Sequence, residues 1–351
     1  MSQQQVVNTQ QQSKITINRT AAAVAAAKNA ERSEERHWLA ADDLQIQFSG
    51  GGRLARAVDD INLEVAAGEI VCLVGESGSG KTTAARALLG LVSPTAGQVS
   101  LDGVPLRRST RALKAHRRRV QLVLQDPTGA LNPRHTVYQA VAEGVRIHRL
   151  GNEQQRVSTA LEQVGLRPVE RFSRRYPHEL SGGQRQRVVI AGALALNPQV
   201  IVADEPVASL DASVRGEILA LFLQLRDELG VGSLIVTHDL GMAWNVADRI
   251  AVMYLGRIVE SGPAEQVLQQ PEHPYTKALL AALPHTGNPQ ELSGEMPDPT
   301  AIPAGCRFHP RCPARISGEA ADVDELCTGS DLPILTAGHD HQAACHLIKR
   351  A

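Results

Sequence analysis

The sequence predicts an α/β protein in which helices cover both faces of a mostly parallel sheet, with an inserted all-helical subdomain and antiparallel β elements. Short apolar runs alternate with amphipathic ones over residues 41–283, as in a parallel sheet joined by crossover helices. Residues 127–195 show helical patterns alone and form the expected insertion. Beyond about residue 284, Pro, Cys and His become frequent, which indicates a separate small cysteine-rich C-terminal appendage, 284–351.

Composition and charge exclude several classes of protein. The 36 Lys and Arg residues nearly balance the 37 Asp and Glu residues, so the net charge of −1 creates no overall attraction to nucleic acid or an anionic membrane. No stretch approaches the roughly 18–20 apolar residues of a membrane span, and no secretion signal is recognisable at the N-terminus. We therefore expect a cytosolic chain.

The elements are expected in a regular order. Residues 1–40 are rich in Gln, Ala, Ser and Asn and predict a mobile extension, because they hold too little apolar surface to offset the entropy of ordering. Strands are expected at 43–48, 69–75, 119–125, 199–205 and 232–238, followed by a hairpin at 249–262. Helices are expected at 82–91, 136–150, 153–166, 214–229, 240–247, 263–270 and 274–283.

A phosphate-binding loop is predicted where the strand at 69–75 meets the next helix. The stretch "GESGSGKTT" fits the P-loop pattern, in which glycines let backbone amides face the phosphates, a lysine adds a positive charge and a hydroxyl binds Mg²⁺. Glu76 is unusual, since a carboxylate beside a triphosphate repels it, and we expect its side chain to point away. The residues predicted to bind nucleotide are Gly75, Ser77, Gly78, Ser79, Gly80, Lys81, Thr82 and Thr83.

Polar side chains at the ends of neighbouring strands predict catalysis. Asp204 is expected to hold Mg²⁺ and Glu205 to polarise an attacking water, since adjacent strand residues face opposite ways. His238 ends another strand at the sheet edge where α/β proteins bind ligands. Gln125 also ends a strand, and its amide can bind Mg²⁺ and contact the water. Glu205, His238 and Gln125 are thus the candidate catalytic residues, and Thr82, Gln125 and Asp204 the Mg²⁺ ligands.

A second anion-binding turn precedes the helix in "ELSGGQRQR". Its glycines begin a helix whose dipole favours negative charge, but no lysine lies in the turn, and an ordinary capped helix is expected to need no double glycine. Together with "QDPTGALNP", "VIVADEP", "SLD" and "TH", the two turns make residues 41–283 resemble the nucleotide-binding subunit of ABC transporters. The resemblance implies a head-to-tail pair in which Ser181, Gly182, Gly183 and Gln184 cover ATP held by the partner's P-loop. It also implies that Asp211 contacts the opposite subunit.

Two other parts of the sequence have more than one interpretation. The resemblance places Phe48 on the adenine ring, while a Phe buried in the core of a strand is the rival interpretation. The basic run at 107–119 could suggest nucleic acid, but no aromatic residues are interleaved, which favours a solvated helix face.

Four of the five cysteines lie in the last fifty residues, while Cys72 lies in a core strand. "HPYTKALLAALP" followed by "GCRFHPRCP" resembles the C-terminal extension of the oligopeptide, dipeptide and nickel importer branch, which implies a [4Fe-4S] cluster. The sequence also allows zinc, free thiols or a disulfide in place of the cluster, with zinc as the rival metal. The long gap before Cys327 departs from the usual pattern. The implied ligands are Cys306, Cys312, Cys327 and Cys345.

The preferred interpretation is an ATPase subunit that energises peptide import from the cytoplasmic face of the membrane. The resemblance implies as partners a second nucleotide-binding subunit, for which a paralogue is favoured over a copy, two membrane permeases and, indirectly, a substrate-binding protein, with no nucleic acid. One competing class is a soluble ABC ATPase that remodels nucleic acid or ribosomes, although neither a second cassette nor a long coiled coil is present in this sequence. The other is a redox- or metal-sensing module.

Overall fold

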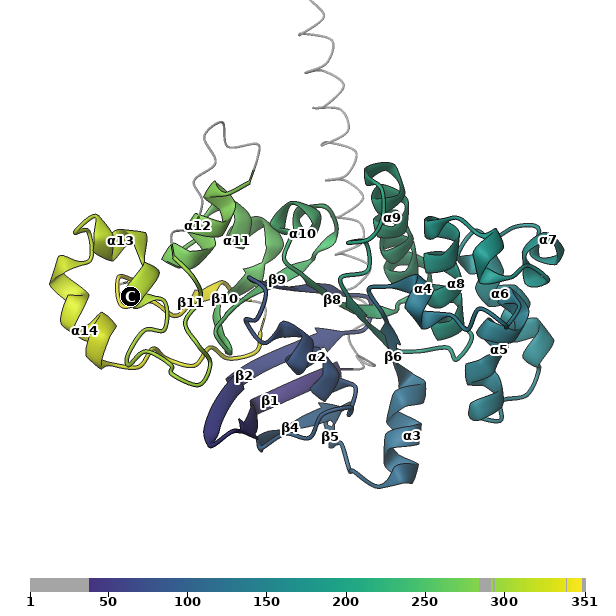
Figure 1. The fold of residues 1–351 in the computed structure, drawn as a ribbon, viewed down its shortest axis with the longest axis horizontal. Helices are drawn as coiled ribbons and strands as arrows, with labels where there is room; N and C mark the ends of the chain where they lie inside the picture. Colours follow the sequence, from purple (N-terminus) through teal and green to yellow (C-terminus); the bar gives the residue numbers. More distant parts are fainter. Residues whose placement is uncertain (1–37, 284–291, 293, 339, 349–351) are drawn as a thin grey trace, which may run out of the picture. The chain divides into compact units, whose positions relative to one another are not determined.

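The computed structural model describes residues 38–283, 292, 294–338 and 340–348 (Figure 1). The predicted mobile extension lies outside the described residues except for its last three, 38–40, which begin strand β1 (Trp38–Gly50). Strand β1 therefore includes three residues that were assigned to the extension, and it starts before residue 43. Leu39 and Ala41 are fully buried, because their side chains face the core.

The main sheet confirms the predicted parallel arrangement. The strands β3 (Ile70–Val74), β6 (Val120–Val123), β7 (Val200–Asp204), β8 (Gly232–Thr237) and β9 (Arg249–Tyr254) pair in parallel in the order β9-β3-β8-β7-β6. Strand β10 (Arg257–Pro263) forms the expected antiparallel hairpin with β9. The apolar runs are continuous because both faces of these strands are buried.

A second sheet is antiparallel, in the order β2-β1-β4-β5. It adds β2 (Arg53–Ala66), β4 (Ala96–Leu101) and β5 (Val104–Pro105) to β1, and none of these three was predicted. Strand β2 does carry an alternating signal, because Ile61, Leu63 and Val65 are buried on one face, and this signal was overlooked. Strands β4 and β5 are short and do not alternate, so the pattern gives no signal for them. Figure 1 shows this sheet in purple to blue beside α2 (Lys81–Leu88).

The insertion between β6 and β7 is helical in every described element. It comprises α4 (Pro127–Ala130), α5 (Val137–Ile147), α6 (Glu153–Gln163), α7 (Val169–Ser173), the 3₁₀ turn η1 (Pro177–Glu179) and α8 (Gly182–Leu194). Val141, Val157 and Ile190, from three of these helices, are fully buried. Figure 1 shows α5, α6 and α8 packed together.

The remaining helices flank the main sheet and its hairpin. They are α3 (Thr110–Arg119), α9 (Ala212–Leu229), α10 (Leu240–Val246), α11 (Ala264–Gln269) and α12 (Pro274–Ala281). The basic run on α3 is not simply solvated. Lys114 Nζ donates to the carbonyl of Ile147 at 2.6 Å, and Arg117 Nη2 donates to the carbonyl of Gly90 at 2.8 Å. No helix within the described part of the chain has both the length and the apolar character needed to cross a membrane.

The C-terminal region is not separate from the rest, contrary to the sequence-based expectation. It contains η3 (His309–Arg311), α13 (Pro313–Ile316), η4 (Ala321–Val323), α14 (Asp324–Gly329) and β11 (Gln342–Ala343). Strand β11 pairs with β10 at the edge of the main sheet. Phe308 is 1% exposed, and its ring lies 5.2 Å from those of Tyr254 and Tyr275. The region therefore shares a core with the sheet.

This shared core predicts that Phe308→Ala destabilises the whole folded chain. Losing a buried aromatic side chain typically lowers the free energy of unfolding by about 3–5 kcal/mol. Urea denaturation should show one transition at lower urea. Ile316→Ala is the control, because that side chain is 69% exposed, and it should shift the free energy by less than about 0.5 kcal/mol. A separate early transition in Phe308→Ala, with the main transition unmoved, would contradict the shared core.

Candidate nucleotide site

The P-loop joins the buried strand β3 to α2, and two of its glycines are required by close packing. A Cβ at Gly75 would lie 2.1 Å from the carbonyl oxygen of Met253, and one at Gly80 would lie 2.1 Å from that of Ala57. Gly80 also has a φ of 107°, in the region that favours glycine. The loop backbone therefore lies directly against β9 and β2, which fixes the direction of its amides.

Lys81 lies across the loop. Its Nζ donates to the carbonyl oxygens of Gly75 and Glu76, both at 2.7 Å. Burial lowers the pKa of Lys81, while the carboxylates of Glu205, Asp204 and Glu76 act in the opposite direction. The ammonium is thus held by the loop itself, next to the acidic end of β7.

Asp204 ends β7 beside the P-loop hydroxyl. Thr82 Oγ1 donates to Asp204 Oδ1 at 3.3 Å. Burial raises the pKa of Asp204, the Thr82 hydrogen bond lowers it, and the nearby Glu205 carboxylate raises it further. A carboxylate and a hydroxyl that meet in this way form a hard-oxygen donor set of the type that Mg²⁺ prefers.

Glu205 connects the three candidate catalytic residues. Its Oε1 lies 2.9 Å from His238 Nδ1, and its Oε2 accepts from Gln125 Nε2 at 3.2 Å. The backbone of Glu205 has a φ of 46°, which is uncommon for a non-glycine residue, and its N–H donates to the carbonyl of Val236. The turn aims Glu205 away from Asp204 although the two are adjacent in sequence.

A cavity of about 190 Å³ opens over the loop. Of the predicted residues, Ser77, Gly78, Gly80, Lys81, Thr82, Thr83 and Glu205 line it. Sequence reasoning missed Arg56, Ala57, Leu255, Gly256 and Pro299. Arg56 and Ala57 lie on the unpredicted strand β2, and Pro299 reaches the site from the C-terminal region, where the carbonyl of Pro299 accepts from the N–H of Arg56 at 3.1 Å.

Phe48 is not a core residue. Its side chain is 48% exposed on β1, so the rival interpretation of a buried strand Phe is wrong. Phe48 does not line the cavity over the P-loop. It leaves an aromatic face available on the surface of the antiparallel sheet.

The second glycine turn begins α8 as expected, but one of its glycines has a local cause that the sequence did not reveal. Ser181 Oγ accepts from the N–H of Gln184 at 3.3 Å, and Gln184 Oε1 accepts from the N–H of Ser181 at 3.1 Å, which forms a capping box. A Cβ at Gly183 would lie 2.5 Å from Val214 Cγ1, so a glycine is needed for packing against α9. Gly183 thus has a packing reason of its own, whereas a Cβ at Gly182 would meet only Leu210 Cδ2 at 3.5 Å, so capping and packing do not account for the double glycine.

The structure does not bring this turn into the P-loop cavity. None of Ser181, Gly182, Gly183 and Gln184 lines that cavity. Asp211 is the N-cap residue of α9, but its side chain accepts no capping hydrogen bond and is exposed. The two glycine turns, each at the start of a helix, therefore do not share one cavity.

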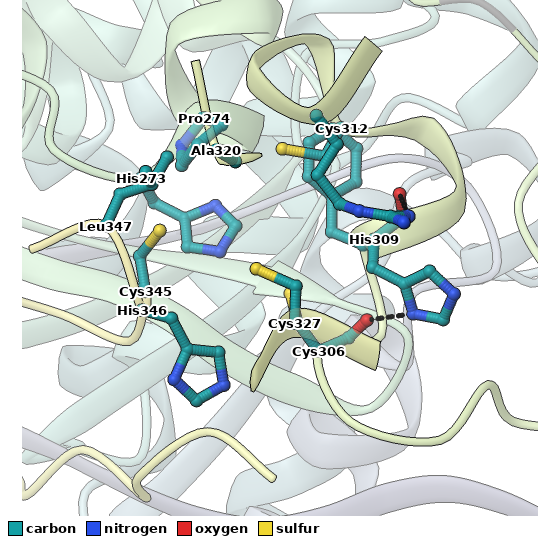
Figure 2. A pocket seen from close by; sticks show the side chains of 12 residues that line it. His273, Pro274, Cys306, His309, Cys312, Ala320, Cys327, Cys345, His346 and Leu347 are labelled. Carbon is teal, nitrogen blue, oxygen red and sulfur yellow. Dashed lines mark hydrogen bonds between the residues drawn. The ribbon is translucent and has the colours of Figure 1, made fainter. Parts of the chain in front are cut away.

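The four C-terminal cysteines line one cavity (Figure 2), although they come from positions up to 39 residues apart in sequence, Cys306 to Cys345. The N–H of Cys306 donates to the carbonyl of Cys327 at 2.9 Å, which closes the long gap before Cys327. The pKa of Cys306 is raised to about 12, chiefly by burial; a hydrogen bond with the backbone of Phe308 acts in the opposite direction, and the three nearby cysteines add to the rise.

These cysteines do not converge on a single point. Within the part of the chain that the structure describes, no group of three or more His, Cys, Asp or Glu residues is arranged to hold one metal ion. All four cysteines have free thiols. His273, His309 and His346 also line the cavity, but His309 Nδ1 and His346 Nε2 lie within hydrogen-bond distance of the carbonyls of Cys306 and Ser330.

The site combines four features: a P-loop, an acidic strand end, a cluster of Glu, Gln and His side chains, and a glycine turn that lies outside the P-loop cavity. Together they define a nucleotide-hydrolysing cassette. Comparison with known proteins identifies the family. The family described as ABC transporter matches residues 58–208, and the family described as the C-terminal region of oligopeptide/dipeptide transporters matches residues 259–318. The chain belongs to the ATP-binding subunits of ABC transporters, which are ATPases.

Curated relatives extend over most of the chain. The chain is 43% identical over 303 residues to the "Probable peptide ABC transporter ATP-binding protein y4tS" of Sinorhizobium fredii, covering 84% of this chain and 83% of that protein. It is 44% identical over 315 residues to a "Putative peptide import ATP-binding protein" of Brucella abortus, covering 87% and 90%.

Two solved structures share the fold. The cbiO1 protein of Clostridium perfringens, described as part of the ABC transporter complex cbiONQ, has a TM-score of 0.62 and 32% identity, covering 67% of this chain and 92% of that one. The dimeric structure of MJ0796, described as a bacterial ABC transporter cassette, has a TM-score of 0.58 and 30% identity, covering 64% and 98%.

The contact between Gly183 and Val214 predicts a compensating pair of substitutions. Gly183→Ala should lower the free energy of unfolding by about 1–3 kcal/mol, because the new methyl group overlaps Val214 Cγ1. Val214→Ala should remove most of that penalty in the double variant. Thermal unfolding of the four proteins in a double-mutant cycle measures the coupling. Additive losses would show that the two residues do not press on each other.

Proposed function

We propose that this chain is the ATP-hydrolysing subunit of an ABC importer for peptides, and that Glu205 activates the attacking water. The observation that carries the proposal is the Glu205 carboxylate, which lines the P-loop cavity with one oxygen beside His238 and the other beside Gln125. The names of the relatives and the oligopeptide/dipeptide C-terminal region support peptides as the substrate class.

The residues around the cavity divide the work of phosphoryl transfer. Amides of the P-loop and the Lys81 ammonium would hold the β and γ phosphates. Thr82, Asp204 and Gln125 would bind Mg²⁺, which neutralises charge on the transferring group, and the direct contact of Thr82 with Asp204 places two of these donors together. Glu205 would orient and polarise the water in line with the γ phosphate.

His238 and Gln125 would position Glu205. In the imidazolium form, the His238 Nδ1–H would donate to Glu205 Oε1 and the Nε2–H would donate to an oxygen of the γ phosphate. Gln125 ties the same carboxylate to the segment that leads from β6 into the helical insertion, and Ser209 Oγ donates to the Gln125 carbonyl at 3.4 Å. A change at the γ phosphate can thus reach the helices that would grip a permease.

The second glycine turn would complete the site of another subunit. Ser181, Gly182, Gly183 and Gln184 lie outside the P-loop cavity of their own chain, and the related MJ0796 cassette has been solved as a dimer. In a head-to-tail pair this turn would close over the γ phosphate of the partner, Asp211 would contact the opposite subunit, and Phe48 would stack on adenine. A paralogue is the proposed partner subunit.

The assembly would also contain two membrane permeases and, indirectly, a substrate-binding protein. This places the chain at the cytoplasmic face of the membrane through its permease partners, and the description of cbiO1 as part of a transporter complex supports that arrangement. A soluble ATPase that remodels nucleic acid is less well supported, because part of the basic run on α3 is occupied by contacts within the chain.

The four cysteines would hold a [4Fe-4S] cluster. In such a cluster each thiolate binds a different iron, so the sulfurs surround the cluster and need not meet at one point. Zinc would require four sulfurs at about 2.3 Å from a single centre. The shared cavity lined by Cys306, Cys312, Cys327 and Cys345 therefore fits the cluster better. A bound cluster would supply cross-linking of the C-terminal segments and sensitivity to oxidation.

Glu205→Gln tests the catalytic proposal. The amide keeps the shape but cannot polarise water, so kcat of the assembled complex should fall by about 100-fold or more, while ATP binding persists. Phosphate release and ATP binding are measured in parallel. The control is Glu217→Gln on α9, whose side chain is 63% exposed, and its turnover should stay at the wild-type rate. Unchanged turnover in Glu205→Gln would refute the role.

The cluster is tested by anaerobic purification of the full chain. We expect about four iron and four sulfide ions per chain, with broad visible absorbance. Cys312→Ser should lose most of both, whereas Cys72→Ser should retain them, because Cys72 lies in β3 within the main sheet. A protein that contains stoichiometric zinc and no iron would overturn the cluster in favour of a Cys₄ zinc site.

A further inference from the structure

The P-loop carries a carboxylate that the ATPase mechanism does not use. Glu76 follows the first P-loop glycine, and the C-terminal region supplies its partner: Arg311 Nη1 donates to Glu76 Oε1 and Nη2 to Oε2, both at 3.1 Å. This fork-to-fork geometry is the strongest arrangement of an arginine and a carboxylate. The Glu76 side chain, expected from the sequence to point away from phosphate, is thus held by a partner that the sequence did not predict.

Arg311 is fixed from several sides. Its side chain is 5% exposed, while that of Glu76 is 28% exposed. The Arg311 guanidinium lies 5.9 Å from the centre of the Tyr254 ring, and Nη1 also donates to the Tyr254 hydroxyl at 3.4 Å. The Arg311 guanidinium is therefore fixed by the aromatic core, and the Glu76 side chain extends toward it.

The backbone of Glu76 is fixed by the same core. The N–H of Glu76 donates to the Tyr275 hydroxyl at 2.9 Å, and the Tyr275 ring lies 4.7 Å from the Tyr254 ring. Residues of α12 and η3 thus hold the main chain and the carboxylate of one P-loop residue, and both rest on Tyr254 in β9. A residue whose only role was to complete the loop would not need both the main-chain contact and the carboxylate contact.

Charge explains why Glu76 needs this partner. ATP brings about four negative charges to the loop. At an effective dielectric of about 20, repulsion between an uncompensated carboxylate and even one of these charges about 12 Å away would amount to a tenfold change in affinity, and closer charges would add to it. The field of Glu76 acts close to the group that would bind phosphate, because Lys81 Nζ donates to the carbonyl of Glu76 at 2.7 Å. The Arg311 guanidinium opposes that field at the carboxylate itself, and neither Arg311 nor Glu76 lines the cavity.

We propose that Arg311 is a positioning residue of the ATP site, which neutralises Glu76 and holds its carboxylate away from the triphosphate. The inference rests on the proposed ATPase function, since it concerns the same P-loop. It assigns to the C-terminal region a direct part in nucleotide affinity. Arg311 lies in η3, immediately before Cys312, so the segment that lines the cysteine cavity also carries the charge that balances the P-loop.

A charge-balance cycle tests the proposal through the Kd for ATP, measured on the full chain. Arg311→Gln leaves Glu76 unbalanced and should raise Kd about tenfold at low salt, and the effect should shrink as salt rises. Glu76→Gln leaves a positive charge and should lower Kd a few-fold. The double variant restores the balance and should return Kd to within about twofold of wild type.

The result for ADP and a matched control separate charge from folding. The rise in Kd for Arg311→Gln should be smaller for ADP, which carries one charge less. Arg146→Gln removes an arginine from a similar bidentate pair with Glu153 in the helical insertion, and it should leave Kd unchanged. Should Arg311→Gln not fold, Arg311→Lys serves instead, with a few-fold rise in Kd that disappears when Glu76→Gln is added.

Two results would overturn the inference while leaving the ATPase assignment intact. One is wild-type affinity in both Arg311 variants. The other is a loss of affinity that persists unchanged in the double variant, which would identify Arg311 as a structural residue only. Failure of the wild-type chain to bind ATP would instead refute the proposed function itself.

Discussion

The structure depends on how closely the P-loop packs between the two sheets. Gly75 leaves no room for a Cβ beneath the carbonyl of Met253 in β9, and Gly80 leaves none beneath that of Ala57 in β2. The N–H of Gly256 also donates to the carbonyl of Ser79 at 2.8 Å. A phosphate cradle needs amides held in fixed directions, and these contacts supply that rigidity from outside the loop. Packing therefore determines the chemistry of the site before any ligand binds.

The acidic end of β7 shows how one strand can serve two roles. Asp204 turns toward the P-loop hydroxyl, while the left-handed backbone of Glu205 carries its side chain to the residues that follow β6 and β8. Strained backbone of this kind persists only where neighbouring contacts enforce it, and the hydrogen bond from the Glu205 N–H to the carbonyl of Val236 is one of them. Adjacent carboxylates can thus differ in environment, so that one suits a metal and the other a water.

The sequence predicted those features that local patterns encode. Continuous apolar strands, the P-loop and the polar strand ends were all recognisable, because their physics depends on a few neighbouring residues. Antiparallel elements and the strand at 43–48 were expected, but three strands of that sheet were missed: β2, although Ile61, Leu63 and Val65 alternate in it, and β4 and β5, which are short and do not alternate. Arg311, Tyr275 and Pro299 could not be assigned to the site from the sequence, since each lies about 190 residues or more from the P-loop or strand residue that it contacts. From the sequence, Gly183 was assigned to an anion-binding turn, and the structure shows that it also packs closely against Val214.

The capping box of α8 is physically consistent with the proposal that this turn completes the nucleotide site of another subunit. Ser181 Oγ satisfies the N–H of Gln184, while the first amides of an α-helix have no acceptor within the helix. In water such amides are hydrated at little cost, so the turn is stable when exposed. If the nucleotide of a second subunit closed against this turn, charged phosphate oxygens would replace that water. The exchange would favour the closed pair only while the γ phosphate is present. Hydrolysis would remove the charge that makes the exchange favourable, and the same turn would then no longer hold the two subunits together.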